Sequence, residues 1–201
     1  MSDTLPTVTI VRHGQTAWSL AGRHTGFTDL PLTAQGEADA RGLAARLAGG
    51  RFDAVITSPL QRAHRTCDLA GFGARASSDD DLKEWNYGDY EGKRTAEIQA
   101  QNPDWHLFRD GCPGGESLAA ISARVDRVCA RLRTHTGSVL VFSSSHLLRV
   151  LTARWLGLPA AGGAYFVLDT ASISVLGYEH TLAFPVIRSW NQTAPHPTPG
   201  A

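Results

Sequence analysis

Residues 9–14 read Thr-Ile-Val-Arg-His-Gly, so an apolar run ends abruptly in a cation, an imidazole and a glycine. The run from Val8 to Val11 is short and rich in β-branched residues, which is typical of a buried strand in a parallel sheet. Arg12, His13 and Gly14 follow it directly. Open α/β sheets bind ligands where their strands end, so this stretch predicts a site at the end of the first strand.

The three residues at this strand end suit an anionic ligand. Arg12 is permanently charged, and its planar fork of donors matches phosphate or carboxylate. His13 can act as a neutral nucleophile at physiological pH. Gly14 lets the backbone pass close to a bound group. Taken alone, these residues fit better with a solvated arginine and histidine at an ordinary strand end, so more of the chain is needed to decide.

The rest of the chain alternates between strand and helix patterns. Further strands are expected at 52–57 and 138–143, near 173–176 and 184–190, and weakly at 75–77. Helices are expected at 33–47, 94–101, 117–132 and 146–156. A further helix is expected to begin with Ser58 as its N-cap and Pro59 as its first residue. This alternation predicts an α/β fold, a three-layer α/β/α sandwich with a mostly parallel central sheet.

The chain length of 201 residues suits one domain, which is predicted to span residues 1–190. Residues 78–115 are mostly without helix or strand periodicity and are expected to form a loop and helix excursion over the active site. Residues 191–201 contain proline, threonine and glycine but no core residues, so this tail is expected to be disordered.

Composition narrows the range of partners. Lysines plus arginines equal aspartates plus glutamates at 19 each, which argues against a nucleic-acid partner. The N-terminus lacks a signal pattern and no apolar run approaches a membrane span, so a cytoplasmic protein without a membrane partner is expected. Cys67, Cys112 and Cys129 are odd in number and have no C-x-x-C spacing, which predicts neither disulfides nor a zinc site. No metal and no cofactor are expected.

Several motifs in order resemble the histidine phosphatase superfamily, the phosphoglycerate-mutase-like proteins. They are RHGQTAWSLAGRHTGFTDLPLTAQGEADA from Arg12, SPLQRAHRT at 58–66, LKEWNYGDYEG at 82–92, PGGES at 113–117 and LRVL at 148–151. The sequence is nearest to the sugar-bisphosphatase-like and broad phosphatase subgroup. The resemblance implies a metal-independent phosphomonoesterase that acts through a phosphohistidine on a small phosphorylated metabolite, such as a sugar phosphate. A monomer or a homodimer is expected.

The resemblance also assigns roles to residues. It makes His13 the nucleophile, and Arg12 and Arg62 the clamps on the phosphoryl oxygens. Arg62 lies in the first turn of its predicted helix, where the helix N-terminus also favours an anion. Glu84 would protonate the leaving group, and its aromatic neighbours could desolvate its carboxyl group. The positions that align near substrate in the family, each of which also fits a helix cap or a loop, are Ser19, Thr25, Tyr87, Glu116 and Ser117.

One position departs from the family pattern. The resemblance places a second catalytic histidine five residues before Arg149, where this chain has Ser144, and a glycine where it has Ser145. His146 matches an additional histidine of a subgroup with an H-G-H pattern. Ser144 is therefore expected to weaken the phosphate site, unless His146 reaches the phosphate instead.

Two other functions remain open. A phosphoglycerate mutase would keep its phosphohistidine by excluding water, with help from a longer insertion after the acid motif. Here Glu84 and Phe108 are only 24 positions apart, which is short for such an insertion. A mutase is therefore less favoured than a phosphatase. A catalytically impaired protein that binds phosphorylated ligands is the other alternative, and the serine at position 144 favours it.

Overall fold

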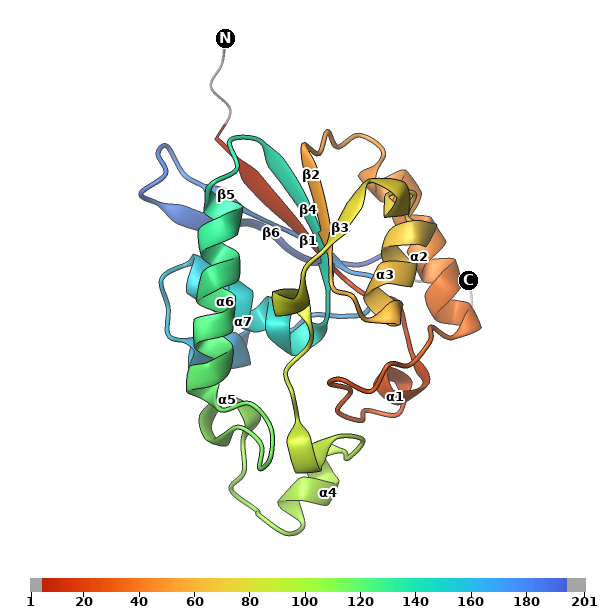
Figure 1. Cartoon of the computed structure of the whole chain (residues 1–201), viewed down its shortest axis with the longest axis vertical. Helices are drawn as coiled ribbons and strands as arrows, with labels where there is room; N and C mark the ends of the chain where they lie inside the picture. The colour runs from red at the N-terminus through yellow and green to blue at the C-terminus, as the bar shows by residue number, and fades with distance from the viewer. Residues whose placement is uncertain (1–4, 195–201) are drawn as a thin grey trace, which may run out of the picture.

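The computed structural model describes residues 5–194 as a six-stranded sheet with helices on both faces (Figure 1). The strand order is β3-β2-β4-β1-β5-β6. The first four of these strands are parallel: β3 (Ala76–Ser78), β2 (Ala54–Thr57), β4 (Ser138–Ser143) and β1 (Thr7–Arg12). Antiparallel pairing adds β5 (Ile173–Tyr178) to β1, and β6 (Pro185–Gln192) to β5. The predicted fold class is confirmed.

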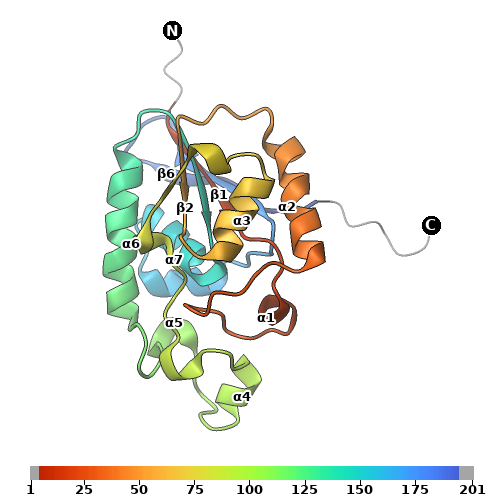
Figure 2. The ribbon, with the colours of Figure 1, turned by 45° about the vertical axis from the view of Figure 1, so that its right-hand side comes forward.

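The two faces of the sheet pack against different pairs of helices, as Figure 2 shows. Along β4, Val139 and Val141 belong to one apolar core, and Leu140 and Phe142 belong to the other. The first core includes residues of α6 (Leu118–Arg133) and α7 (Ser145–Trp155). The second includes residues of α2 (Ala34–Leu47) and α3 (Gln61–Leu69). Because successive side chains of a strand point to opposite faces, one apolar strand serves both layers.

Among the predicted helix starts, those at Thr33 and Ser117 are confirmed and the one at Ser58 and Pro59 is wrong. Thr33 and Ser117 cap α2 and α6 by accepting the N–H groups of Gly36 and Ala120. The third helix, α3, begins at Gln61 rather than at Ser58 and Pro59. The carboxylate of Asp29 accepts the Gln61 N–H at 2.8 Å, so a distant loop supplies the cap that the local sequence lacks.

The crevice for a ligand arises from the order of the central strands. β1 and β4 are parallel neighbours, and Arg12 lies in register with Ser143 at their carboxyl ends. The chain leaves β1 toward the face that α2 covers and leaves β4 toward the face that α7 covers. Ligands of open α/β sheets bind at such a switch point.

The segment between β3 and α6 lies beyond the strand ends, as expected for the excursion, and it carries α4 (Thr95–Gln99) and α5 (Leu107–Asp110) (Figure 1). It meets the loop that contains α1 (Ala17–Leu20) through an isolated bridge between Arg23 and Arg94. The predicted helix at 94–101 is shorter than expected. The remaining elements are short 3-10 helices: η1 (Gly73–Arg75), η2 (Asp80–Leu82), η3 (Gly88–Tyr90) and η4 (Ala160–Tyr165).

The end of the sheet corrects the predicted domain boundary. β6 continues to Gln192, so residues 191 and 192 belong to the sheet rather than to a disordered tail. Residues 195–201 of that predicted tail lie outside the described part of the chain.

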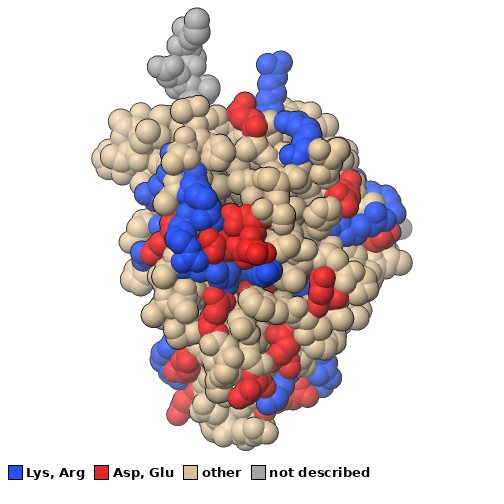
Figure 3. Space-filling model, in the orientation of Figure 1, with Lys and Arg blue, Asp and Glu red and all other residues tan. Residues whose placement is uncertain are grey.

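On the face that Figure 3 shows, acidic and basic side chains intermix. Two ion pairs link α6 to the loop before Glu84, Arg127 with Asp81 and Arg131 with Asp79. Between residues 5 and 194, no helix is long and apolar enough to cross a membrane.

Candidate active site

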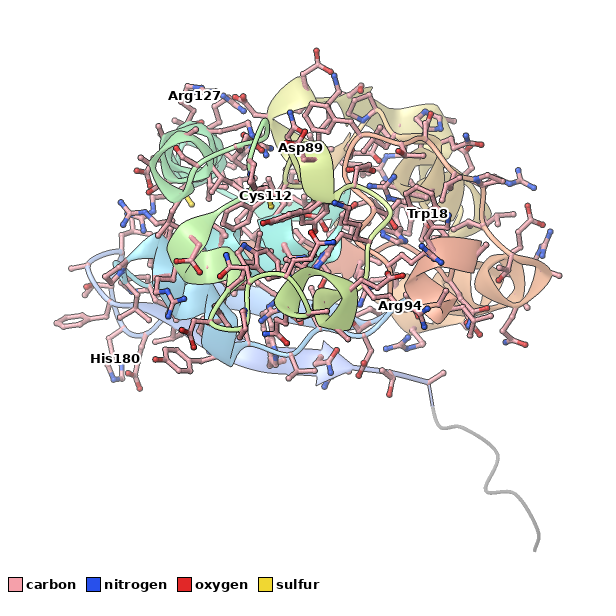
Figure 4. All side chains as sticks on the ribbon, turned by 90° about the horizontal axis from the view of Figure 1, so that it is seen from below. Trp18, Asp89, Arg94, Cys112, Arg127 and His180 are labelled. Atoms are coloured by element: carbon pink, nitrogen blue, oxygen red, sulfur yellow. The ribbon has the colours of Figure 1, made fainter. Side chains whose placement is uncertain are left out.

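A polar cavity of about 260 Å³ lies where β1 and β4 end, on the side of the molecule seen in Figure 4. Larger hollows exist, including one of about 700 Å³ beside residues 169–171, but arginine, histidine and carboxylate groups converge in this smaller one. The residues that line it are Arg12, His13, Ser19, Gly22, Arg23, His24, Thr25, Glu84, Tyr87, Thr95, Ser145 and His146.

His13 lies at the end of β1 with only 4% of its surface exposed. Its Nδ1 is 2.7 Å from the carbonyl oxygen of Gly14, and a carbonyl can only accept, so Nδ1 carries the hydrogen. The other ring nitrogen, Nε2, then keeps its lone pair. Burial lowers the pKa of His13 well below 6.5, and the charges of Arg62 and Arg12 lower it further. A neutral imidazole with a free lone pair is what a nucleophile requires.

Two guanidinium groups lie close enough to His13 to lower its pKa. Arg62 is fully buried, and its two Nη atoms donate to the carbonyls of Thr25, Gly26 and Thr28. Arg12 donates through Nη1 to the carbonyl of Leu168. The Nε atoms of both arginines are buried and have no partner among the described residues. A buried donor without a partner is costly, and a bound oxyanion would satisfy it.

Glu84 lies against the N-terminus of α7. One carboxyl oxygen, Oε1, accepts the N–H groups of Leu147 at 2.7 Å and of Trp85 at 2.9 Å. The other, Oε2, accepts the N–H of His146 at 3.0 Å. Glu84 is buried beside a fully buried tryptophan, as the sequence predicted, and the helix amides fix it in place. Because Oε2 has one partner only, it retains a lone pair that can carry a proton.

Three uncharged rings form one wall of the cavity. The Tyr87 hydroxyl is 2.6 Å from Nδ1 of His146, and the ring of His24 lies 4.8 Å from that of Tyr87 and 6.0 Å from that of His146. Burial lowers the pKa of His24 to about 4 and that of His146 well below 6.5, and it raises the pKa of Tyr87 well above 10. Tyr87 therefore donates its hydroxyl hydrogen to Nδ1, and Nε2 of His146 is the nitrogen that carries the hydrogen.

The three residues that follow β4 differ in whether they reach the cavity. Ser144 is fully buried, its Oγ has no partner among the described residues, and it does not line the cavity. Ser145 and His146, at the first turn of α7, do line it. The structure thus brings His146, rather than Ser144, to the cavity wall.

Of the remaining predicted residues, Ser19, Thr25 and Tyr87 line the cavity, whereas Gly14, Glu116 and Ser117 do not. A Cβ on Gly14 would lie 2.4 Å from the carbonyl oxygen of Gly36, so this glycine permits close packing of two backbones rather than the approach of a ligand. Glu116 accepts both Nε and Nη2 of Arg124, at 2.8 and 2.6 Å. Ser117 is the cap of α6.

Sequence reasoning missed Gly22, Arg23, His24 and Thr95 as cavity residues. Arg23 and His24 lie within the quoted GRHTG motif, which was the available signal, but Thr95 had none. Oε1 of Glu91 accepts the N–H groups of Gly26 and Thr28 and holds the loop that Arg62 also binds. Among residues 5–194, no group of three or more histidine, cysteine, aspartate or glutamate side chains is placed to hold a metal ion.

Known proteins share this combination of fold and motifs. The sequence model of the histidine phosphatase superfamily (branch 1) matches residues 8–193. This chain belongs to the histidine phosphatase superfamily.

Named relatives indicate the activity of this histidine phosphatase. It is 43% identical over 176 residues to an acid phosphatase of Mycobacterium tuberculosis, with 85% of this chain and 86% of that protein covered. It is 37% identical over 191 residues to sedoheptulose 1,7-bisphosphatase of Saccharomyces cerevisiae, with coverage of 79% and 70%. A solved structure from Mycobacterium tuberculosis superimposes with a TM-score of 0.88 at 38% identity, covering 93% and 97% of the two chains. The protein is a phosphatase.

Proposed function

We propose that this histidine phosphatase hydrolyses phosphomonoesters of small metabolites, sugar phosphates above all, through a phosphohistidine at His13 and without a metal. The observation that carries the proposal is His13 itself. It is held neutral with its Nε2 lone pair free, near two guanidinium groups whose Nε atoms are buried and unpaired.

In the first step of the proposed reaction, the Nε2 lone pair of His13 attacks phosphorus and a P–N bond forms. The bond between phosphorus and the ester oxygen breaks, and Glu84 gives a proton to the departing alkoxide. Arg12 and Arg62 stabilise the negative charge on the phosphoryl oxygens, and their permanent charges take the place of a metal ion.

In the second step, water attacks the phosphohistidine and Glu84, now ionised, accepts a proton from it. The P–N bond breaks, its electron pair returns to Nε2, and phosphate leaves. Glu84 is protonated again, so both groups return to their starting states.

The cavity lining supports a polyhydroxylated substrate. Residues with hydroxyl groups, Ser19, Thr25, Thr95 and Ser145, line the same cavity as the neutral rings. Hydroxyl groups and ring faces together suit the polar edges and apolar faces of a sugar. Similarity to a yeast sugar bisphosphatase also favours this substrate class.

Ser144 is proposed to weaken the activity without abolishing it. Removing one donor to a transition-state oxyanion costs about 10²- to 10³-fold in rate. Nucleophile, acid and both arginines remain, and Nε2–H of His146 has no partner among residues 5–194 and is not sealed from solvent. His146 is therefore proposed as a weaker, uncharged replacement for the missing histidine.

A cytoplasmic location is also part of the proposal. All three cysteines are free and buried, which fits a reducing compartment.

Phosphate release from a panel of sugar phosphates and phosphoglycerates tests this function. We expect release that EDTA does not reduce and that added 2,3-bisphosphoglycerate does not stimulate. Isomerisation of phosphoglycerate that depends on the bisphosphate would indicate a mutase. Ligand binding without any turnover would indicate the non-catalytic alternative, and EDTA inhibition reversed by zinc or magnesium would overturn the metal-independent mechanism.

A further inference from the structure

A second arginine lines the cavity besides Arg12. Arg23 has no carboxylate within 4.0 Å among residues 5–194, whereas its neighbour across the isolated bridge, Arg94, pairs with Glu97. An arginine in a cavity without an acidic partner leaves a fixed positive charge, which favours an anion there.

The Arg23 guanidinium is held in place before any ligand binds. Its Nη1 donates to the carbonyl of Gly92 at 2.6 Å. The backbone on either side is tied to the excursion, because the His24 N–H donates to the Lys93 carbonyl and the Gly92 N–H donates to the His24 carbonyl, both at 2.9 Å. Nε and Nη2 have no described partner and are not sealed from solvent. A group anchored by one nitrogen loses less freedom when its other donors bind.

Arg23 lies beside the segment that leads into α4. The charges that lower the pKa of His13 are those of Arg62 and Arg12. Arg23 instead contacts residue 92, bridges to Arg94 and lies near Glu97 of α4. Figure 1 places α4 beyond the strand ends, and Figure 4 labels Arg94 on the exposed side of this region. The phosphoryl group under attack already has two guanidinium groups, so Arg23 is available to another part of the substrate.

We infer that Arg23 forms a second anion subsite, which selects phosphate esters carrying a further anionic group, a second phosphate or a carboxylate. This inference rests on the proposed function. It narrows the substrate class from sugar phosphates in general to doubly anionic ones.

The test compares fructose 1,6-bisphosphate with fructose 6-phosphate, which share a skeleton and differ in one phosphate. We expect wild-type kcat/KM to be higher for the bisphosphate. Arg23→Gln removes the charge but keeps an amide that can donate to the Gly92 carbonyl. It should lower kcat/KM for the bisphosphate by about tenfold or more, through KM, and leave the monophosphate within about twofold. Arg23→Lys should retain part of the preference.

Arg51→Gln is the matched control, because Arg51 is exposed at the opposite end of the sheet. A purely structural role of Arg23 would lower kcat/KM equally for both substrates, and that result, or no change for either, would overturn the inference. If wild-type protein released phosphate from neither sugar, the proposed function would fail on its own. Calorimetry would then measure the binding of both sugars to His13→Gln and to the double variant with Arg23→Gln. If Arg23→Gln weakens binding of the bisphosphate but not of the monophosphate, the subsite is supported. Any other pattern contradicts it.

Discussion

Burial gives His13 a different chemistry from that of a solvated histidine. Removal from water disfavours the imidazolium form, and the nearby charges of Arg62 and Arg12 disfavour it further, so the pKa of His13 is well below 6.5. The carbonyl of Gly14 then selects the tautomer with its hydrogen on Nδ1. The lone pair of Nε2 is therefore available in the resting protein.

An NMR titration of the imidazole nitrogens checks this state. We expect His13 to remain neutral, with its hydrogen on Nδ1, from pH 8 down to pH 5.5. His180, whose side chain is largely exposed, is a surface histidine for comparison. Protonation of His13 with a midpoint near pH 6.5 would show that burial and the arginines do not set its charge.

The serine at position 144 provides a second test at the level of single residues. Ser144→His with Ser145→Gly should raise kcat by about tenfold or more, because it restores a donor at the end of β4. His146→Ala should lower kcat if His146 partly replaces the missing histidine. Both variants are compared with wild type on one good substrate. A fall in kcat for both, or no change in either, would contradict this account of the site.

At the level of elements, the buried Arg124 side chain links the loop that carries Glu84 to α6. Arg124 donates to the carbonyls of Asp81, Lys83 and Glu84 and forms a two-pronged ion pair with Glu116. This ion pair is largely buried, so removing one partner leaves an uncompensated charge.

Arg124→Ala is expected to destabilise the protein by about 3 kcal/mol and to lower kcat, because Glu84 loses its support. Urea unfolding and steady-state kinetics measure the two effects. Arg127→Ala is the matched control, since Arg127 lies one turn along α6 and pairs with the same loop at an exposed position. Equal effects of the two substitutions would contradict the role given to Arg124.

The secondary-structure elements also show how much of the site could be predicted from the sequence. The pattern around β1 predicted that His13 follows the end of a strand, and the structure places it there, because a short apolar run that stops at polar residues is a local signal. The motif resemblance added Arg62 and Glu84, which come from distant parts of the chain. The cap that Asp29 provides for α3 and the cavity position of Thr95 depend on contacts between remote segments, and no local pattern carries such information.

At the scale of the whole molecule, buried histidines couple stability to pH. The folded-state pKa of His24 is lowered to about 4 by burial, whereas in the unfolded chain it is near 6.5. Between these values the unfolded state binds more protons, so the stability present above pH 6.5 is lost as the pH falls toward 4.

This coupling predicts that the free energy of unfolding drops between pH 7 and pH 5, with His24 contributing about 2 kcal/mol. His24→Gln should remove that share of the pH dependence. Urea unfolding at both pH values measures it in each protein. An identical drop in wild type and variant would show that His24 is not responsible.

The central claim is that the whole fold serves to present His13 as the group that accepts the phosphoryl group. Its most direct test is a rapid quench of the protein with a ³²P-labelled substrate, followed by analysis of the labelled protein. We predict an acid-labile, base-stable phosphohistidine in wild type and in His64→Ala, whose histidine is exposed on α3. In His13→Ala, both the phosphohistidine and turnover should be lost. Turnover of His13→Ala within tenfold of wild type, or a labelled histidine that persists in it, would contradict the claim.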